Sequence, residues 1–346
     1  YSIKRKMKCF VWFLLFFNLA STACAAGTDY IIFGLNASKD LAGKIAKELK
    51  MPLGQAEVGR FNDGEISIKI NENVRNKQVF IIQSTARQAN SSVNDNVMEL
   101  YLFSRALKRA SAANITAIIP YYGYGRQDRK TSARTPISAA DMAKLIETAG
   151  VNRVVAIDLH AGQIQGFFQN IPVDNLYGSY LMAKHFAEKE LRNPVVVSPD
   201  AGGVVRAKKF REVLEQHGMK SGFALLIKTR SAPGVVESST VIGDIKGRDI
   251  IIVDDICDTG GTLVKSAEEL KNLGARNIYA SITHPVFSKD ALDKIENSVF
   301  KEILVTDSIE VNRKTPKVYQ ISVAPLLSEV IQRIDRGDSI SGVFRL

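Results

Sequence analysis

One segment of the sequence combines acids, hydroxyls and glycines directly after an apolar run. Residues 250–253 have the composition of a buried strand, and they are followed by Asp254, Asp255 and then Asp258-Thr259-Gly260-Gly261-Thr262. Glycines let the backbone approach an anion, and free N–H groups at a helix start can donate to a phosphate. The pattern predicts a phosphate on residues 258–262, with the paired acids facing sugar hydroxyls or a metal. The alternative is a solvated loop or helix cap.

A second polar segment, Asp158-Leu159-His160, also follows an apolar run, at 153–157. An imidazole and a carboxylate at the end of a strand suit a bound metal or a polyphosphate. A lone histidine in such a place is more often structural, so the segment by itself leaves both interpretations open.

The charge balance favours a small anionic ligand. Lys and Arg number 46 against 36 Asp and Glu, which leaves a net charge of +10. Beyond the first ten residues the basic side chains are dispersed among acidic ones, whereas nucleic-acid binding needs a clustered basic face. The three cysteines, Cys9, Cys24 and Cys257, are too scattered for a disulfide framework and are typical of a reducing compartment.

The length of 346 residues exceeds what one core usually organises, so we expect two domains. Short apolar runs alternate with helix-length amphipathic stretches, which predicts an α/β fold of two doubly wound domains, at 29–175 and 176–346, each with a mostly parallel sheet. The last helix could pack back onto the first domain. Expected strands are 30–34, 78–83, 115–119, 153–157, 195–198, 223–227, 249–253, 277–283 and 302–305; expected helices are 38–49, 94–110, 137–149, 202–217, 262–273 and 324–334.

The N-terminal 28 residues have the shape of a signal peptide. Basic residues at positions 4–8 precede the apolar run 10–17, and small residues follow at 21–26. The run is shorter than the roughly 20 residues of a spanning helix. The alternative is a non-native extension with Met7 as the initiator. We leave residues 1–28 outside the predicted fold in either case.

Two of these segments carry a resemblance to known enzymes. Residues 250–262 resemble the phosphoribosyl-pyrophosphate loop of type I phosphoribosyltransferases. Residues 158–168 resemble the signature of ribose-phosphate pyrophosphokinases, which ordinary phosphoribosyltransferases lack. The similarity covers nearly all of residues 29–346. It implies two domains of the type I phosphoribosyltransferase-like fold, and a Mg²⁺-dependent transfer of the diphosphoryl group of ATP to the 1-hydroxyl of ribose 5-phosphate, with 5-phosphoribosyl 1-pyrophosphate and AMP as products.

Further segments extend the resemblance. Residues 59–65 resemble the family segment that reaches the adenine from a neighbouring subunit, residues 121–130 the ATP-binding segment, and residues 198–206 a block with a metal-associated acid. The resemblance therefore implies these assignments: ATP on Phe61, Asp63, Glu65, Arg126 and Gln127; ribose 5-phosphate on Asp254, Asp255 and Asp258 to Thr262; metal on His160 and Asp200; catalysis by Lys228, Arg230 and His160; and a possible allosteric site at Arg134, Gln165, Ser339, Ser341 and Phe344.

The resemblance also implies partners and a compartment. We expect a homo-oligomer, a hexamer built from dimers, with no nucleic acid and no membrane for the folded part, in the cytoplasm unless residues 1–28 direct export or organelle targeting. The chain departs from the family pattern at 86–93 and 169–171, which are longer, and in the loop 228–234, which lacks basic residues that commonly follow. A non-catalytic regulatory homologue and a phosphoribosyltransferase remain the alternatives.

Overall fold

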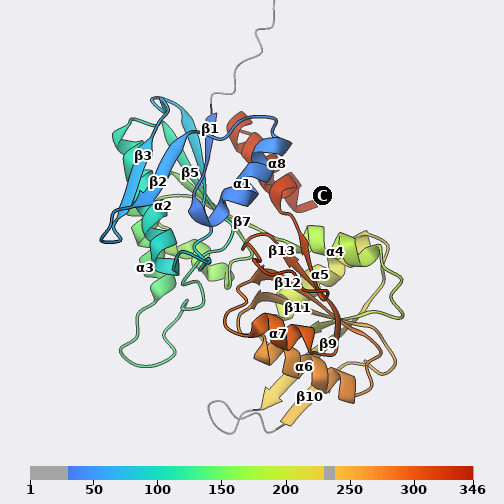
Figure 1. The fold of residues 1–346 in the computed structure, drawn as a ribbon. Helices are drawn as coiled ribbons and strands as arrows, with labels where there is room; N and C mark the ends of the chain where they lie inside the picture. Colours follow the sequence, from blue (N-terminus) through green and yellow to red (C-terminus); the bar gives the residue numbers. More distant parts are fainter. Residues whose placement is uncertain (1–29, 230–237, 346) are drawn as a thin grey trace, which may run out of the picture.

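The computed structural model describes residues 30–229 and 238–345, which form two α/β units (Figure 1). The first unit is built on a five-stranded sheet in the order β1-β4-β5-β6-β7, and all of its neighbouring strands are parallel. The predicted fold class is confirmed. The strands are β1 (Tyr30–Gly34), β4 (Gln78–Ile82), β5 (Asn114–Ile119), β6 (Arg153–Ile157) and β7 (Val173–Leu176), and β7 contains the boundary expected between 175 and 176.

Helices cover both faces of this first sheet because alternate strand residues point to opposite sides. Ile31 and Phe33 of β1 pack in one core with α2 (Val93–Arg109) and α3 (Ser138–Thr148). Ile32 packs in the other core with α1 (Lys39–Glu48) and α8 (Ala324–Arg336). Strands buried on both faces read as continuous apolar runs, as they do in this sequence.

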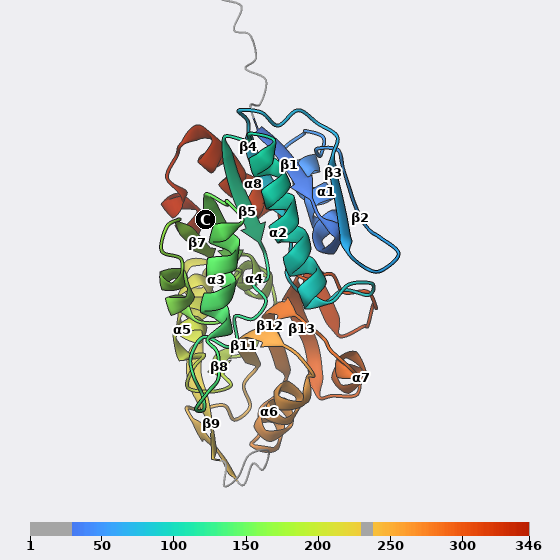
Figure 2. The same cartoon turned by 90° about the vertical axis from the view of Figure 1, so that its left-hand side faces the viewer.

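Helix α8 belongs to the first unit in space although it follows the second sheet in the sequence. Leu327, Val330 and Ile331 are fully buried in a core with Leu41 and Ile45 of α1. Figures 1 and 2 both show α8 beside α1 at the end of the molecule that holds β1. The C-terminal segment therefore ties the two units together.

The second unit is built on a seven-stranded sheet in the order β10-β9-β8-β11-β12-β13-β14, in which only β10 and β9 are antiparallel. The chain leaves β8 toward β9 and leaves β11 toward β12, so the order reverses between β8 and β11. Its strands are β8 (Val195–Ser198), β9 (Gly222–Thr229), β10 (Ser238–Ile242), β11 (Ile250–Cys257), β12 (Ile278–Pro285), β13 (Phe300–Thr306) and β14 (Val318–Ile321). Helices α4 (Ser179–Ala187) and α5 (Val204–Gln216) cover one face, and α6 (Gly261–Asn272) and α7 (Ala291–Glu296) cover the other.

Every expected strand and helix overlaps one in the structure, and Gly150 and Gly274, which come just after α3 and α6, have φ of 92° and 98°. Several short elements were not expected. The largest is the antiparallel hairpin β2 (Ala56–Arg60) and β3 (Ile66–Ile70), which forms its own two-stranded sheet. The others are β7, β10, β14, α4, α7 and the 3-10 turns η1 (Asn36–Ser38), η2 (Gly162–Phe167) and η3 (Ile340–Arg345). None of the helices within the described ranges is long and apolar enough to cross a membrane.

Candidate active site

The reversal of strand order between β8 and β11 marks the place where an open α/β sheet usually binds its ligand, outside the carboxyl ends of the strands. The loop after β8 carries Asp200, and the end of β11 carries Asp254 and Asp255. The two acids lie inside the observed strand, because β11 continues past the predicted end at Val253 to Cys257. The change from apolar to polar residues after Val253 was therefore mistaken for the end of the strand.

The predicted phosphate loop joins β11 to α6. Gly260, at the N-cap of α6, has φ of 73°, a left-handed conformation that favours glycine. No side chain from the described residues caps this helix, so its N-terminal amide groups can donate to a bound anion. Asp258, at the start of the loop, accepts a hydrogen bond from the Ser288 hydroxyl, and the Ser288 N–H donates to the Asp258 carbonyl across 3.0 Å. The geometry fits the predicted anion site.

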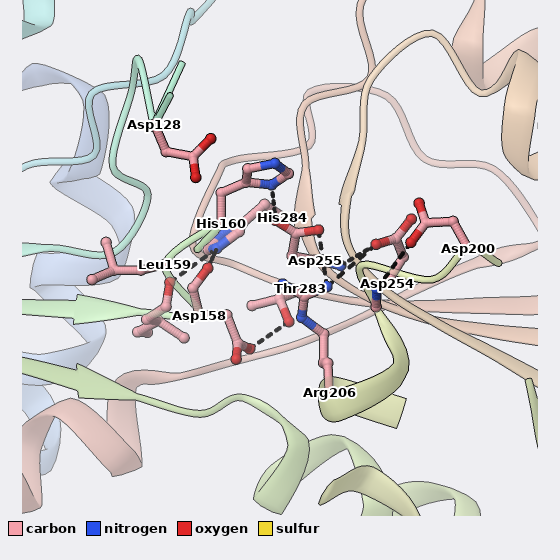
Figure 3. Close-up of polar contacts among 12 residues, drawn as sticks. Asp128, Asp158, Leu159, His160, Asp200, Arg206, Asp254, Asp255, Thr283 and His284 are labelled. Carbon is pink, nitrogen blue, oxygen red and sulfur yellow. Dashed lines mark hydrogen bonds and ion pairs between the residues drawn. The ribbon is translucent and has the colours of Figure 1, made fainter. Parts of the chain in front are cut away.

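His160 of the first unit reaches β11 of the second (Figure 3). Its Nδ1 lies 2.7 Å from Oδ2 of Asp255, which is only 3% exposed. The hydrogen bond with Asp255 raises the pKa of His160 above its ordinary value. Burial would raise the pKa of Asp255, but the hydrogen bond with His160 and the charge of Arg206 dominate and lower it. The ionised carboxylate must accept, so Nδ1 carries a proton, and above the pKa of His160 the neutral imidazole keeps Nε2 free for a ligand.

Arg206 of α5 lies between the paired acids. Its Nη1 is 3.2 Å from Oδ1 of Asp255 and 3.4 Å from Oδ1 of Asp254. Burial first, and then the neighbouring charge of Asp255, raises the pKa of Asp254. Two adjacent carboxylates that share one cation favour a single negative charge in the absence of ligands, and added cations favour ionisation of both. The site is thus prepared for a positively charged ligand or a hydroxyl donor.

The sequence pattern suggested that the Asp158 carboxylate, together with His160, faces a bound metal or polyphosphate. In the structure this carboxylate is turned away from His160. It is 5% exposed, and its Oδ2 accepts hydrogen bonds from the Thr283 hydroxyl across 2.6 Å and from the Gly178 N–H across 3.0 Å. Figure 3 shows this carboxylate turned toward Thr283 and away from the imidazole of His160. Asp158 is therefore a structural residue, and His160 alone of this pair faces the paired acids.

The residues assigned to ATP fall into two places. Arg126 donates to Asp258 across 2.7 Å, and the side chain of the adjacent Gln127 accepts from the Ser138 hydroxyl. Phe61, Asp63 and Glu65 lie instead at the tip of the β2–β3 hairpin, where Phe61 is 59% exposed. Among the described residues no hydrogen bond or ion pair joins this tip to Arg126.

The other assigned residues are also dispersed. Asp200 is exposed and its Oδ1 accepts from the Gly203 N–H across 2.9 Å. Lys228 lies in β9, paired with Ser239 of β10, and Arg230 lies outside the described residues. Of the possible allosteric residues, Arg134 is in the loop before α3, Gln165 is in η2, and Ser339, Ser341 and Phe344 are in or beside η3. Within the described ranges no hydrogen bond joins Arg134 or Gln165 to the residues near η3.

Four residues at the site had not been assigned a role: Arg206, Thr283, His284 and Ser288. Arg206 lies within the segment 198–206, which resembles the family. Its place in the first turn of a helix that follows two glycines is the signal that could have marked it as a site residue. Thr283 and His284 end β12, the neighbour of β11. No local pattern distinguishes them, because their partners Ile157 and Asp158 lie in the first unit, far away in the sequence.

Comparison with known proteins identifies the family. Residues 30–150 match the model of the N-terminal domain of ribose phosphate pyrophosphokinase, and residues 227–345 match the phosphoribosyl synthetase-associated domain. The chain is 50% identical over 320 residues to a ribose-phosphate pyrophosphokinase of Shewanella oneidensis, covering 91% of this chain and 99% of that protein. It is 47% identical over 317 residues to one of Wolinella succinogenes, with the same coverage of 91% and 99%.

A solved structure agrees with the sequence comparison. The phosphoribosylpyrophosphate synthetase of Mycobacterium smegmatis is 36% identical and superposes with a TM-score of 0.80, covering 89% of this chain and 99% of that one. The two matched ranges include Arg126 and the segment 254–262. The chain therefore belongs to the ribose-phosphate pyrophosphokinase family.

Proposed function

We propose that this chain transfers the diphosphoryl group of ATP to the 1-hydroxyl of ribose 5-phosphate, giving 5-phosphoribosyl 1-pyrophosphate and AMP. The observation that supports this most directly is the 2.7 Å contact between His160 Nδ1 and Asp255 Oδ2, because it brings the segment at the end of β6 against the predicted sugar-phosphate site. An ordinary phosphoribosyltransferase would need only the sugar-phosphate site and not the segment at the end of β6.

The sugar phosphate fits the second unit. Its 5-phosphate would accept hydrogen bonds from the loop 258–262 and the N-terminus of α6. Asp254 and Asp255 would accept from the ribose hydroxyls or face a metal bound there. ATP would lie on Arg126 and Gln127, with Phe61, Asp63 and Glu65 supplied by a neighbouring copy of the chain, because the hairpin tip is exposed and separate from Arg126.

Mg²⁺ is the cofactor that we propose. Among the described residues no group of three or more His, Cys, Asp or Glu is arranged to hold a metal ion. Mg²⁺ usually keeps several waters and takes one or two carboxylates together with substrate phosphates, so the carboxylates of Asp200 and Asp255 and the free Nε2 of His160 fit an ion that enters with the nucleotide. When bound, Mg²⁺ neutralises charge on the phosphate oxygens.

The protein's own contribution is positioning and charge. The 1-hydroxyl oxygen forms a bond to the β-phosphorus while the bond from the β-phosphorus to the oxygen that bridges it to the α-phosphorus breaks. AMP leaves with that oxygen, and the hydroxyl proton passes to solvent. Such transfer needs cations and two well-held substrates more than a strong base. Lys228, near the end of β9, and Arg230, which follows the strand in the sequence, would close over the reacting phosphates.

The test is AMP formation from ATP and ribose 5-phosphate, assayed with and without Mg²⁺. We expect AMP and 5-phosphoribosyl 1-pyrophosphate in equal amounts, and only when ATP, the sugar phosphate and Mg²⁺ are all present. Binding of both ligands without turnover would indicate a non-catalytic homologue. Consumption of 5-phosphoribosyl 1-pyrophosphate with a purine or pyrimidine base would indicate a phosphoribosyltransferase.

Assembly and regulation are further parts of the proposal. A hexamer built from dimers would complete the ATP site with the hairpin tip of a second copy, so a monomer should be inactive. Sedimentation that finds a fully active monomer at assay concentration would contradict this. Phosphate activation and ADP inhibition would act through Arg134, Gln165, Ser339, Ser341 and Phe344; hyperbolic kinetics with only competitive ADP inhibition would count against that site.

A further inference from the structure

The backbone that carries His160 has an unusual conformation two residues earlier. Asp158 has φ of 43°, which non-glycine residues rarely adopt. Such conformations persist only where surrounding groups impose them, and they often occur beside functional sites. The question is therefore which groups impose this one.

Two residues near the end of β12, in the second unit, supply the groups that hold Asp158 in this conformation. Thr283 Oγ1 donates to Asp158 Oδ2 across 2.6 Å and holds the side chain. His284 Nε2 lies 3.0 Å from the carbonyl oxygen of Ile157 and 3.2 Å from that of Asp158, and holds the main chain. Each contact joins residues more than a hundred positions apart in the sequence.

The tautomer of His284 follows from its partners. Carbonyl oxygens only accept, so Nε2 carries a proton. In the neutral ring Nδ1 can accept from the Ser308 hydroxyl at 2.9 Å, and it is nearer to that hydroxyl than the Thr283 carbonyl at 3.2 Å. The ring is 2% exposed and meets the edge of Tyr121 at a centroid distance of 5.0 Å. Burial lowers the pKa of His284, which favours this neutral form. The imidazole is thus held on both nitrogens and cannot rotate freely.

These contacts fix the His160 loop at two points. The start of the loop is held by Thr283 and His284 of β12, and the imidazole of His160 is held by Asp255 of β11. Strands β11 and β12 are parallel neighbours, with Ile256 opposite His284. One rigid edge of the second sheet therefore determines both where the loop leaves β6 and where its histidine points (Figure 3).

We propose that Thr283 and His284 are positioning residues of the active site, which hold Asp158 in its left-handed conformation and so keep Nδ1 of His160 on Asp255. The proposal rests on the proposed function for its kinetic consequence but not for its structural one. Loss of the His284 donor leaves two carbonyls without their partner, and the loop relaxes away from β11.

The structural test uses the protein without metal or substrates. Two-bond ¹H–¹⁵N spectra of the imidazoles report which nitrogen is protonated, and the chain has only 4 histidines. Above its pKa, His160 should carry its proton on Nδ1 in the wild type, and Asp255→Asn should change that signal and so assign it. His217, which is exposed, is the internal reference.

Two matched pairs of variants separate the hydrogen bonds from packing. His284→Leu removes the donor, whereas His284→Gln keeps an amide donor near the Nε2 position. Thr283→Val removes the hydroxyl at nearly constant shape, whereas Thr283→Ser keeps it. We expect His160 to lose its Nδ1–H tautomer in the Leu and Val variants and to retain it in the Gln and Ser variants.

Activity provides the second measurement. The Leu and Val variants should lose about 10- to 100-fold in kcat, the usual effect of removing a partner that orients a ligating side chain, with KM for ATP changed less than about 3-fold. The Gln and Ser variants should recover most of kcat.

The proposal is overturned if folded His284→Leu or Thr283→Val retains both the Nδ1–H tautomer of His160 and wild-type kcat. If His284→Leu fails to fold, the Thr283 pair decides alone. If the wild type forms no AMP, the proposed function fails, and the spectra still decide whether these two residues position His160.

Discussion

The Arg126 guanidinium donates to the Asp258 carboxylate across 2.7 Å and joins the predicted ATP segment to the predicted sugar-phosphate loop. Partial burial would raise the pKa of Asp258, but hydrogen bonds from Ser288 and Arg126 outweigh it, and the pKa is lowered. The carboxylate is thus ionised at neutral pH. A cation expected to hold ATP is therefore already paired with an acid of the neighbouring substrate site.

We expect Arg126→Ala and Asp258→Asn to change ATP affinity in opposite directions. Loss of Arg126 removes a charged hydrogen bond and should weaken ATP binding about 10-fold or more. Asp258→Asn releases Arg126 from an exposed ion pair worth up to about 1 kcal/mol, so ATP should bind up to about 5-fold more tightly. Calorimetry with ATP and Mg²⁺, without ribose 5-phosphate, measures both.

Arg129→Ala is the matched control, because Arg129 is an exposed arginine of the same segment. It should leave ATP affinity within about 2-fold of the wild type because, unlike Arg126, Arg129 makes no ion pair with the loop 258–262 among the described residues. Equal weakening by Arg126→Ala and Arg129→Ala would mean that only the net charge of the segment matters.

The pair of His160 and Asp255 predicts a pH dependence of stability in the metal-free protein. The pKa of His160 is raised by its hydrogen bond with Asp255. A raised pKa contributes stability that is fully present below the unfolded value of about 6.5 and is lost as the pH rises through the folded value. Urea unfolding at several pH values between about 6 and 9 should show this loss, and Asp255→Asn should abolish it.

His217→Gln is the control for this experiment, since His217 is exposed at the end of α5. Its pH profile should match that of the wild type. A profile that is flat in the wild type, or unchanged in Asp255→Asn, would show that the contact does not stabilise the folded state.

Lys228 and Arg230 remain catalytic predictions from the sequence. As cations that contact the reacting phosphates mainly in the transition state, they should affect kcat more than binding. Lys228→Ala should reduce kcat by about 10³-fold, which is about 4 kcal/mol of barrier, and change KM for ribose 5-phosphate less than about 10-fold. Arg230→Ala should behave similarly.

Arg230→Lys distinguishes a planar bidentate contact from simple charge, and it should restore activity only in part. Steady-state kinetics of the three variants are sufficient. Near-normal kcat with a raised KM for ATP alone would place catalysis elsewhere.

From the packing of α8 on α1 we predict that the C-terminal helix stabilises the first unit. Leu327 is 0% exposed in the core shared with α1. Leu327→Ala should lower the free energy of unfolding by about 2–5 kcal/mol, as large-to-small changes in cores do. Arg336→Ala, on an exposed position of the same helix, should change it by less than about 0.5 kcal/mol. Chemical denaturation measures both, and equal effects would contradict the observed packing.

The sequence by itself determined the longer elements and the family-specific loops of this protein. Apolar runs such as 250–253 and amphipathic stretches such as 94–110 report burial through their periodicity, which is a local property, and their positions agree with β11 and α2. The candidate anion site at 258–262 was proposed from the sequence for a similar reason. Its glycines, hydroxyls and helix start are adjacent in the chain.

Tertiary structure alone decided which side chains meet. The pattern Asp-Leu-His suggested that Asp158 and His160 act together, yet the fold turns Asp158 onto Thr283 and His160 onto Asp255. The sequence suggested that α8 could pack on the first domain, but only the fold shows that its apolar face meets α1. Periodicity shows that a face is buried but not against what, because the partner is chosen by how two sheets dock over segments far apart in the chain.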